Sequence, residues 1–304
     1  MPQHLLSMEA LGFDPLDALL NRAEALRTTH DCRDRLAGHA VCTLFFEPST
    51  RTRLSFQRAA QRLGADVLGF EAATSSATKG ETALDTLKNI EAMGVRAFII
   101  RAREDGLVAR LAESADNDTA LINAGDGRSQ HPTQALLDML TIREAKGRDF
   151  SALKVAIVGD ILHSRVARSD LAALKTLGVG EICVAGPANL LPQDATLVGC
   201  QISRDLDEAL ADADVVMTLR LQRERMEDGL ITSLADYHRD YGITAKRLQR
   251  AKPDAIVMHP GPLNRGVEIS DEVADGPHSR ILRQVENGVL VRMAVLERAF
   301  ADCR

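Results

Sequence analysis

Short apolar runs alternate with longer amphipathic stretches along most of the chain. Several of the apolar runs are unbroken, which is typical of parallel strands covered on both faces. The longer stretches repeat apolar residues at helical spacing and end in glycine, a common helix stop. This alternation predicts an α/β fold with parallel sheets. The predicted strands are 41–46, 66–70, 97–102, 120–124, 154–160, 181–186, 214–219 and 255–260, and the clearest helices are 54–64, 81–94, 132–147 and 168–178.

The order of these elements indicates a domain boundary near residues 146–148. One run of β/α units precedes this point, and the predicted strand at 154–160 begins a second run. A length of 304 residues also suits two domains of ~150 residues each. The stretch 279–300 predicts a final helix, with Gly288 as a weak point.

Composition and charge narrow the class of protein. The net charge of −6 and the pI near 5.8 argue against nucleic acid as the main partner. The N-terminus lacks the pattern of a secretory signal, and no apolar run approaches the ~18 residues of a membrane helix. The five cysteines are scattered without a C-x-x-C pair, so we expect neither a disulfide framework nor a zinc site. A reducing cytoplasm is the expected compartment.

Ligand sites in such folds lie beyond the carboxyl ends of the strands, so the residues after each strand carry the candidate chemistry. The first of these stretches is Ser49-Thr50-Arg51-Thr52, ahead of a helix. Ser49 or Thr50 is expected to cap the helix, and the N–H groups at a helix start attract anions. Arg51 adds a planar fork that fits phosphate or carboxylate oxygens, and Thr52 adds a hydroxyl. An ordinary capped helix with surface arginines is the alternative that this stretch leaves open.

Three further strand ends in the first half carry candidates. Lys79 is the only cation of the loop at 74–82, and Arg101 closes the strand at 97–102. His131 and Gln134 lie three residues apart at a helix start and can face the same side. An imidazole and an amide together suit a carbonyl or carboxamide group. A solvated lysine, a surface arginine and a structural histidine remain the alternatives.

In the second half, Arg165 and Arg220 follow strands and suit a second anionic ligand, although each alone is more often a surface residue. No Walker A loop, G-x-G-x-x-G or H-E-x-x-H occurs, so we expect no nucleotide loop and no metal site. The whole set predicts a cleft that binds two anionic small molecules and acts by placement and charge stabilisation.

Five segments, in order, resemble the aspartate carbamoyltransferase catalytic chains over essentially the whole sequence. They are STRTRLSF, SSATKGET, GDGRSQHPTQALLD, MTLRLQRER and HPGPLNRGVEI. The ornithine enzymes carry Ser-Met-Gly and His-Cys-Leu-Pro elements where this chain has RLQRER and HPGP, so the resemblance favours aspartate. It implies carbamoyl transfer from carbamoyl phosphate to the α-amino group of L-aspartate, in pyrimidine biosynthesis and without a cofactor. Another carbamoyltransferase, of ornithine type, and a non-catalytic subunit of a pyrimidine-pathway assembly remain alternatives.

The resemblance also implies an architecture. It implies two doubly wound parallel-sheet domains of similar size, with the active site in the cleft between them. The carbamoyl-phosphate-binding domain would comprise residues 1–146 and the C-terminal helix 283–304, and the aspartate-binding domain residues 147–282. The implied assembly is a homotrimer in which subunits share sites, and the family admits regulatory or dihydroorotase-like partner chains.

Site residues follow from the same resemblance, motif by motif. For carbamoyl phosphate they are Ser49, Thr50, Arg51, Thr52, Arg101, His131, Gln134, Gly261 and Pro262. For L-aspartate they are Arg165, Arg220 and Gln222, with Lys79 and Ser75 from the neighbouring subunit. His131 would bond the carbamoyl oxygen and Gln134 the amide, while the turn at Gly261 and Pro262 would offer backbone groups to the NH₂. The catalytic group would be Arg51, Thr52, Arg101 and His131.

Overall fold

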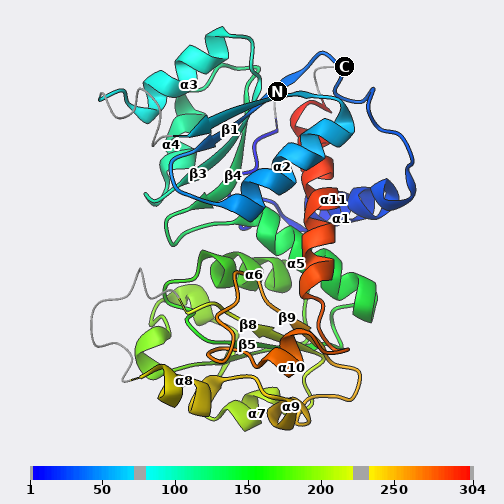
Figure 1. Ribbon diagram of the computed structural model, residues 1–304, viewed down its shortest axis with the longest axis vertical. Coiled ribbons are helices and arrows are strands. Elements are labelled where there is room, and N and C mark those ends of the chain that lie inside the picture. The colour runs from blue at the N-terminus through cyan, green and yellow to red at the C-terminus, as the bar shows by residue number, and fades with distance from the viewer. Residues whose placement is uncertain (1–2, 72–79, 222–232, 302–304) are drawn as a thin grey trace. The chain divides into compact units, whose positions relative to one another are not determined.

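The computed structural model describes residues 3–71, 80–221 and 233–301 (Figure 1). The chain divides into two compact units, the first of residues 1–140 and 285–304, and the second of residues 141–284. The division falls within two helices, α5 (Pro132–Lys146) and α11 (Ile281–Ala299). Within the described ranges no helix has the length and apolar character needed to cross a membrane.

The first unit is built on a four-stranded parallel sheet in the order β2-β1-β3-β4. Figure 1 shows β1, β3 and β4 side by side. Because β1 leads to β2 on one side and β3 leads to β4 on the other, the chain changes winding direction between β1 and β3. The elements are α1 (Phe13–Thr28), β1 (Ala40–Phe45), α2 (Thr50–Leu63), β2 (Asp66–Glu71), α3 (Ala83–Ala92), β3 (Ala97–Ala102), α4 (Leu107–Ser114) and β4 (Ala120–Asp126).

The second unit holds a five-stranded parallel sheet in the order β7-β6-β5-β8-β9. Its winding direction changes between β5 and β8. The strands are β5 (Lys154–Val158), β6 (Glu181–Ala185), β7 (Gln201–Ser203), β8 (Val215–Thr218) and β9 (Ile256–Met258). The helices are α6 (Arg165–Thr176), α7 (Leu206–Leu210), α8 (Leu234–Tyr241), α9 (Ala245–Leu248) and α10 (Asp271–Ala274), with short 3₁₀ turns at Ala188–Leu190 and Ala195–Leu197.

Unbroken burial explains why the strands read as apolar runs. All seven residues of β4 are buried, and β5, β6, β8 and β9 are buried almost throughout. Parallel strands with both faces covered need apolar side chains on both faces. The predicted α/β class with two parallel sheets is therefore confirmed.

Glycines end several helices because the chain turns there with a positive φ. Gly64 follows α2 with a φ of 83°, and a Cβ at this position would lie 1.8 Å from the carbonyl oxygen of Arg33. No other residue fits that approach without a shift of the backbone. The predicted helix stop at residue 64 is thus both a turn and a packing contact.

Three local predictions differ from the structure. The apolar pattern marks helix α2 only from Leu54, whereas the helix begins at Thr50, next to the predicted cap, because the polar residues of its first turn carry no apolar periodicity. Strand β7 was not predicted, because its exposed residues form no apolar run. The weak point expected at Gly288 is wrong, because α11 runs through it unbroken. A Cβ on Gly288 would lie 2.5 Å from Nη1 of Arg292, so the glycine makes room for that side chain.

Candidate functional site

The start of α2 lies at the carboxyl end of β1, next to the change of winding direction. Ser49 is the N-cap residue by its extended backbone, with φ −160° and ψ 103°, but its side chain accepts no hydrogen bond from the helix. The predicted cap position is therefore confirmed, and the usual capping bond is absent at this residue. A helix start whose cap hydroxyl leaves the first-turn N–H groups to other acceptors suits an anion. Thr52 is buried and Arg51 exposed in the same turn.

Arg101 is held at the same edge of the sheet. It lies opposite Phe45 in the β1–β3 register, and its Nη2 is 2.7 Å from Oε1 of Glu47. Its Nη1 also donates to the carbonyl oxygen of Ala124, at 3.2 Å. Both charged side chains are largely buried, at 13% and 8% exposed. Desolvation makes such a pair directional and costly to break, so Arg101 is fixed where the strands end.

A tight turn after β4 leads to His131. Oδ1 of Asp126 accepts the Gln130 N–H, and its Oδ2 accepts the Gly106 N–H, both at 3.1 Å. Burial raises the pKa of the Asp126 carboxyl, while these hydrogen bonds act in the opposite direction. Gly127 has a φ of 46°, and a Cβ there would lie 1.9 Å from Oδ1 of Asp105. These hydrogen bonds and the close approach at Gly127 constrain the backbone of the turn, which places His131 at the start of α5.

His131 and Gln134 are both buried at the start of α5, as the spacing predicted for one helix face. Nε2 of Gln134 donates to both carboxylate oxygens of Asp138, at 3.1 Å each. A carboxylate only accepts, so the amide orientation of Gln134 is fixed and its Oε1 is the atom that can accept from a ligand N–H. This geometry suits a carboxamide NH₂ group.

Behind Asp138 lies a buried arginine from the last helix. Arg292 is 4% exposed, and its guanidinium carbon lies 5.0 Å from the ring centroid of Phe56. Burial lowers the pKa of Arg292 to about 10, and the charge of Asp138 opposes that change. Arg292 therefore stays protonated at neutral pH and balances the carboxylate that orients Gln134.

In the second unit, Arg165 begins α6 at the carboxyl end of β5. The cap Ser164 accepts the Ala167 N–H through its hydroxyl at 3.1 Å, which contrasts with Ser49 on α2. Asp160 is fully buried, and its Oδ1 lies 2.9 Å from Nδ1 of His163 and accepts the N–H of the same residue. These contacts fix the loop that places Arg165.

Two other predicted elements lie at the same edge of the second sheet. Arg220 lies two residues after the end of β8, so Arg165 and Arg220 stand after the two strands that flank the change of winding direction. The turn after β9 contains Gly261 and Pro262, joined by a cis peptide bond. Gly261 is half-buried and Pro262 exposed.

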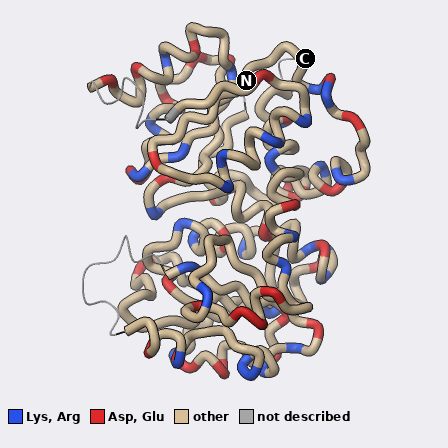
Figure 2. The backbone as a smooth tube through the Cα atoms, viewed as in Figure 1, with Lys and Arg blue, Asp and Glu red and all other residues tan. Residues whose placement is uncertain are grey.

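The predicted site residues thus gather at the carboxyl edges of their sheets, four strand ends at the two changes of winding direction and two on neighbouring strands. Lys79, Ser75 and Gln222 lie outside the described residues. Across the parts of the chain that the structure describes, no cluster of three or more His, Cys, Asp or Glu side chains could hold a metal ion. Basic and acidic residues are interspersed along both units (Figure 2).

Four residues that bear on the site were missed in the sequence. Glu47 lies two residues before the segment that begins at Ser49 yet gave no signal, because only the sheet order brings it to Arg101. Asp138 lies four residues after Gln134, a helical spacing that would have indicated the contact. His259 and Glu268 form a buried pair beside Gly261, and the histidine of the HPGP segment was the available sign.

Comparison with known families matches both units. Residues 3–144 match the family described as "Aspartate/ornithine carbamoyltransferase, carbamoyl-P binding domain". Residues 151–299 match "Aspartate/ornithine carbamoyltransferase, Asp/Orn binding domain". The two matches together cover nearly the whole chain.

Individual relatives are members of the same family. The chain is 67% identical over 299 residues to the aspartate carbamoyltransferase catalytic subunit of Xanthomonas campestris pv. campestris, which covers 97% of this chain and 95% of the relative. A crystal structure of aspartate transcarbamoylase from Trypanosoma cruzi, in complex with carbamoyl phosphate and aspartate, is 32% identical with a TM-score of 0.87, covering 98% and 96% of the two chains. Ornithine carbamoyltransferase from Thermus thermophilus is 28% identical with a TM-score of 0.87, covering 98% and 99%.

The two serine caps make a matched pair for a stability test. Ser164→Ala removes a capping bond, so we expect it to lower the free energy of unfolding by about 1 kcal/mol. Ser49→Ala removes no bond to its helix, so we expect a change within about 0.5 kcal/mol. Urea unfolding of the two variants and the parent protein measures both values. Equal losses would show that the Ser49 hydroxyl caps α2 after all.

Proposed function

The chain belongs to the aspartate/ornithine carbamoyltransferase family, and we propose how the residues at its sheet edges act in its reaction. That reaction transfers the carbamoyl group of carbamoyl phosphate to the α-amino group of L-aspartate, giving N-carbamoyl-L-aspartate and phosphate. One observation carries this function, namely 67% identity over 97% of the chain to an aspartate carbamoyltransferase catalytic subunit. The arginines after the strands of both sheets suit the two anionic substrates that it requires.

The phosphate of carbamoyl phosphate binds at the start of α2. Ser49, Thr50 and Thr52 supply hydroxyls and first-turn N–H groups, and the helix dipole favours the negative charge. Arg51 gives a two-point contact to phosphate oxygens. Support for this assignment comes from the cap hydroxyl of Ser49, which leaves the N–H groups of its own helix to another acceptor.

The carbamoyl group is held by residues of three strand ends. Arg101 and His131 donate toward its carbonyl oxygen, and Oε1 of Gln134 accepts from its NH₂. Gly261 and Pro262 offer backbone carbonyl oxygens to the same NH₂. The contact from Gln134 to Asp138 supports the role of Gln134, because it leaves the acceptor atom toward the ligand.

L-Aspartate carries two carboxylates, and Arg165 and Arg220 bind one each as planar forks. Gln222, Lys79 and Ser75 are proposed as further contacts from residues outside the described ranges, the last two from a neighbouring subunit. The alternative of an ornithine substrate would place a cationic side chain beside Arg165 and Arg220, which is unfavourable. The shared fold with the Thermus ornithine enzyme does not separate the two substrates, but these arginines favour the dicarboxylate.

The chemical step requires no protein nucleophile. The aspartate nitrogen forms a bond to the carbamoyl carbon, negative charge grows on the carbonyl oxygen, and the carbon–oxygen bond to phosphate breaks. Arg51, Thr52, Arg101 and His131 are placed in advance around the oxygens that gain charge, and loss of one such donor costs about 2.7–4 kcal/mol of barrier. The leaving phosphate takes the proton from the amine.

Family membership also supports a proposal about assembly and location. We propose a homotrimer in which the loop containing Ser75 and Lys79 completes the site of a neighbouring subunit. We also propose a cytoplasmic enzyme of de novo pyrimidine biosynthesis, with regulatory or dihydroorotase-like chains as further partners. A non-catalytic subunit is the second candidate, but every site residue assigned from the motifs is present in the sequence, which supports a catalytic chain.

The substrate assignment is tested with a panel of amines. Carbamoyl phosphate with L-aspartate should release phosphate and form N-carbamoyl-L-aspartate, while L-ornithine should give background rates. Phosphate release and mass spectrometry of the product measure both. The assignment would be wrong if the folded protein carbamoylated L-ornithine, or if it carbamoylated neither amine.

Two arginines lie on the same turn of α2, and replacing each in turn distinguishes an effect on ligand binding from a general effect of surface charge. Arg51→Ala should lower kcat by about a hundredfold to a thousandfold, because it removes a donor to the phosphate. Arg53→Ala, two residues along, should keep the rate within about threefold, since Arg53 has no proposed contact to ligand. Steady-state kinetics on both variants decide the matter. A near-normal rate for Arg51→Ala would remove that residue from the phosphate site.

A further inference from the structure

The turn after β9 is built around a buried histidine. His259 is 1% exposed, and its Nδ1 accepts the N–H of Gly261 at 2.7 Å. A ring nitrogen that accepts an N–H cannot itself carry a proton, so the neutral ring carries its hydrogen on Nε2. That Nε2 lies 3.1 Å from Oε1 of Glu268, to which it donates. Both nitrogens of the ring are therefore used, one by the turn and one by an acid.

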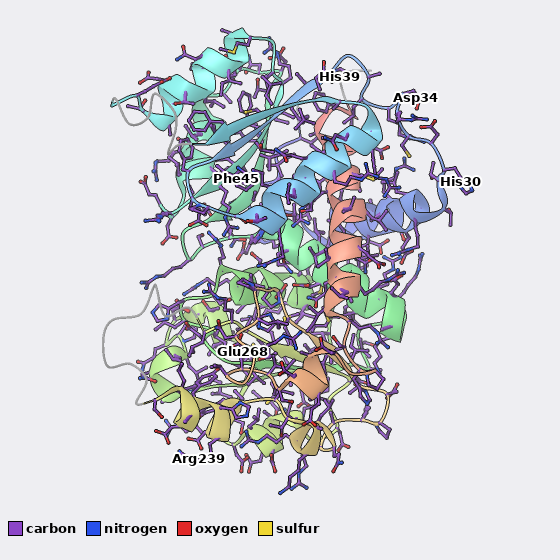
Figure 3. The ribbon with its side chains drawn as sticks, viewed as in Figure 1. His30, Asp34, His39, Phe45, Arg239 and Glu268 are labelled. Carbon is purple, nitrogen blue, oxygen red and sulfur yellow. The ribbon has the colours of Figure 1, made fainter. Side chains whose placement is uncertain are left out.

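Glu268 connects the far side of the same segment. It is fully buried in the second unit, where Figure 3 labels it, and its Oε1 also accepts the N–H of Asn264 at 2.6 Å. The backbone N–H of His259 in turn donates to Oε1 of Gln284, at 3.0 Å. The segment from His259 to Glu268 is thus anchored before, within and after the turn at Gly261 and Pro262.

We propose that His259 is a positioning residue for the reaction, which with Glu268 fixes the Gly261–Pro262 turn so that its backbone carbonyls meet the carbamoyl NH₂. This inference rests on the proposed function of that turn. The Gly261 N–H is occupied by His259 and Pro262 has no N–H, so the backbone groups that these two residues can offer a ligand are carbonyl oxygens, the acceptors that an NH₂ group requires. Neither His259 nor Glu268 contacts the substrate itself.

The position of a backbone carbonyl matters because the turn has no side chain that could adjust. A misplacement of about 1 Å at a reacting group can cost about a hundredfold in rate. Buried hydrogen bonds in a low-dielectric setting hold such a group more firmly than solvated ones. Folding alone would require only a solvent-exposed turn at this point. The buried bonds of His259 and Glu268 therefore indicate that the position of the turn itself matters.

Two substitutions separate the two bonds of His259. In His259→Asn the amide oxygen stands near the position of Nδ1 and can still accept from Gly261. In His259→Gln the amide nitrogen stands near the position of Nε2 and can still donate to Glu268, while the Gly261 N–H loses its acceptor. His278→Asn is the matched control, because the ring of His278 also bonds a backbone group, the Ala255 oxygen at 2.7 Å, away from the turn.

We expect His259→Gln to lower kcat/KM for carbamoyl phosphate by about tenfold to a hundredfold, the effect of one buried unpaired N–H. His278→Asn should stay within about threefold of the parent. His259→Asn keeps the acceptor for Gly261 but loses the donor to Glu268, so its loss of kcat/KM should be clearly smaller than that of His259→Gln. The melting temperatures of the variants should not follow the order of their kcat/KM values. Equal kinetics for His259→Gln and His259→Asn would overturn the positioning role. If the parent protein transfers no carbamoyl group, the proposed function fails instead.

A substitution at a buried histidine can prevent folding, so the bond is also measured in the parent protein. Long-range ¹H–¹⁵N spectra of protein labelled with ¹⁵N-histidine report which ring nitrogen carries the hydrogen. We expect His259, assigned through its proximity to Gly261, as the Nε2–H tautomer with Nδ1 unprotonated. A ring with hydrogen on Nδ1 could not accept from Gly261 and would overturn the inference without any variant.

Discussion

Parallel strand pairing is the constraint on which the site depends. Every ladder between named strands is parallel in both described sheets, so the carboxyl ends of all strands in a sheet meet at one edge. The order of strands then decides which ends can hold a ligand, because loops diverge where the winding direction changes. In the first unit this happens between β1 and β3, where the start of α2 and Arg101 lie. In the second it happens between β5 and β8, where Arg165 and Arg220 follow.

Buried acids then fix the donors and acceptors at these edges. Glu47 holds Arg101, Asp138 orients Gln134, and Glu268 accepts from His259 beside the turn at Gly261. Each acid is almost fully removed from water, which makes its contacts strong and directional. The result is a set of polar groups arranged before substrate arrives, which is what charge stabilisation in a transition state requires.

The sequence allowed the prediction of the strands and of the motif residues, because apolar runs and strand-end residues are both local signals. Strand β7 escaped because Gln201–Ser203 is a short exposed edge strand without an apolar run. The first turn of α2, Thr50, Arg51 and Thr52, has no apolar period, so only the predicted cap at Ser49 or Thr50 indicated where the helix begins. The supporting acids escaped for another reason. Glu47 meets Arg101 only through strand order, and Glu268 meets His259 only through a folded loop.

The central claim is that the start of α2 is a phosphate site whose N–H groups the cap residue leaves to the ligand. A crystal structure of this protein with inorganic phosphate measures it directly. The account predicts phosphate oxygens at about 2.7–3.2 Å from first-turn N–H groups of α2, with Arg51 and the Ser49 hydroxyl turned toward them. Phosphate bound only elsewhere, with the Ser49 hydroxyl bonded to its own helix, would contradict it.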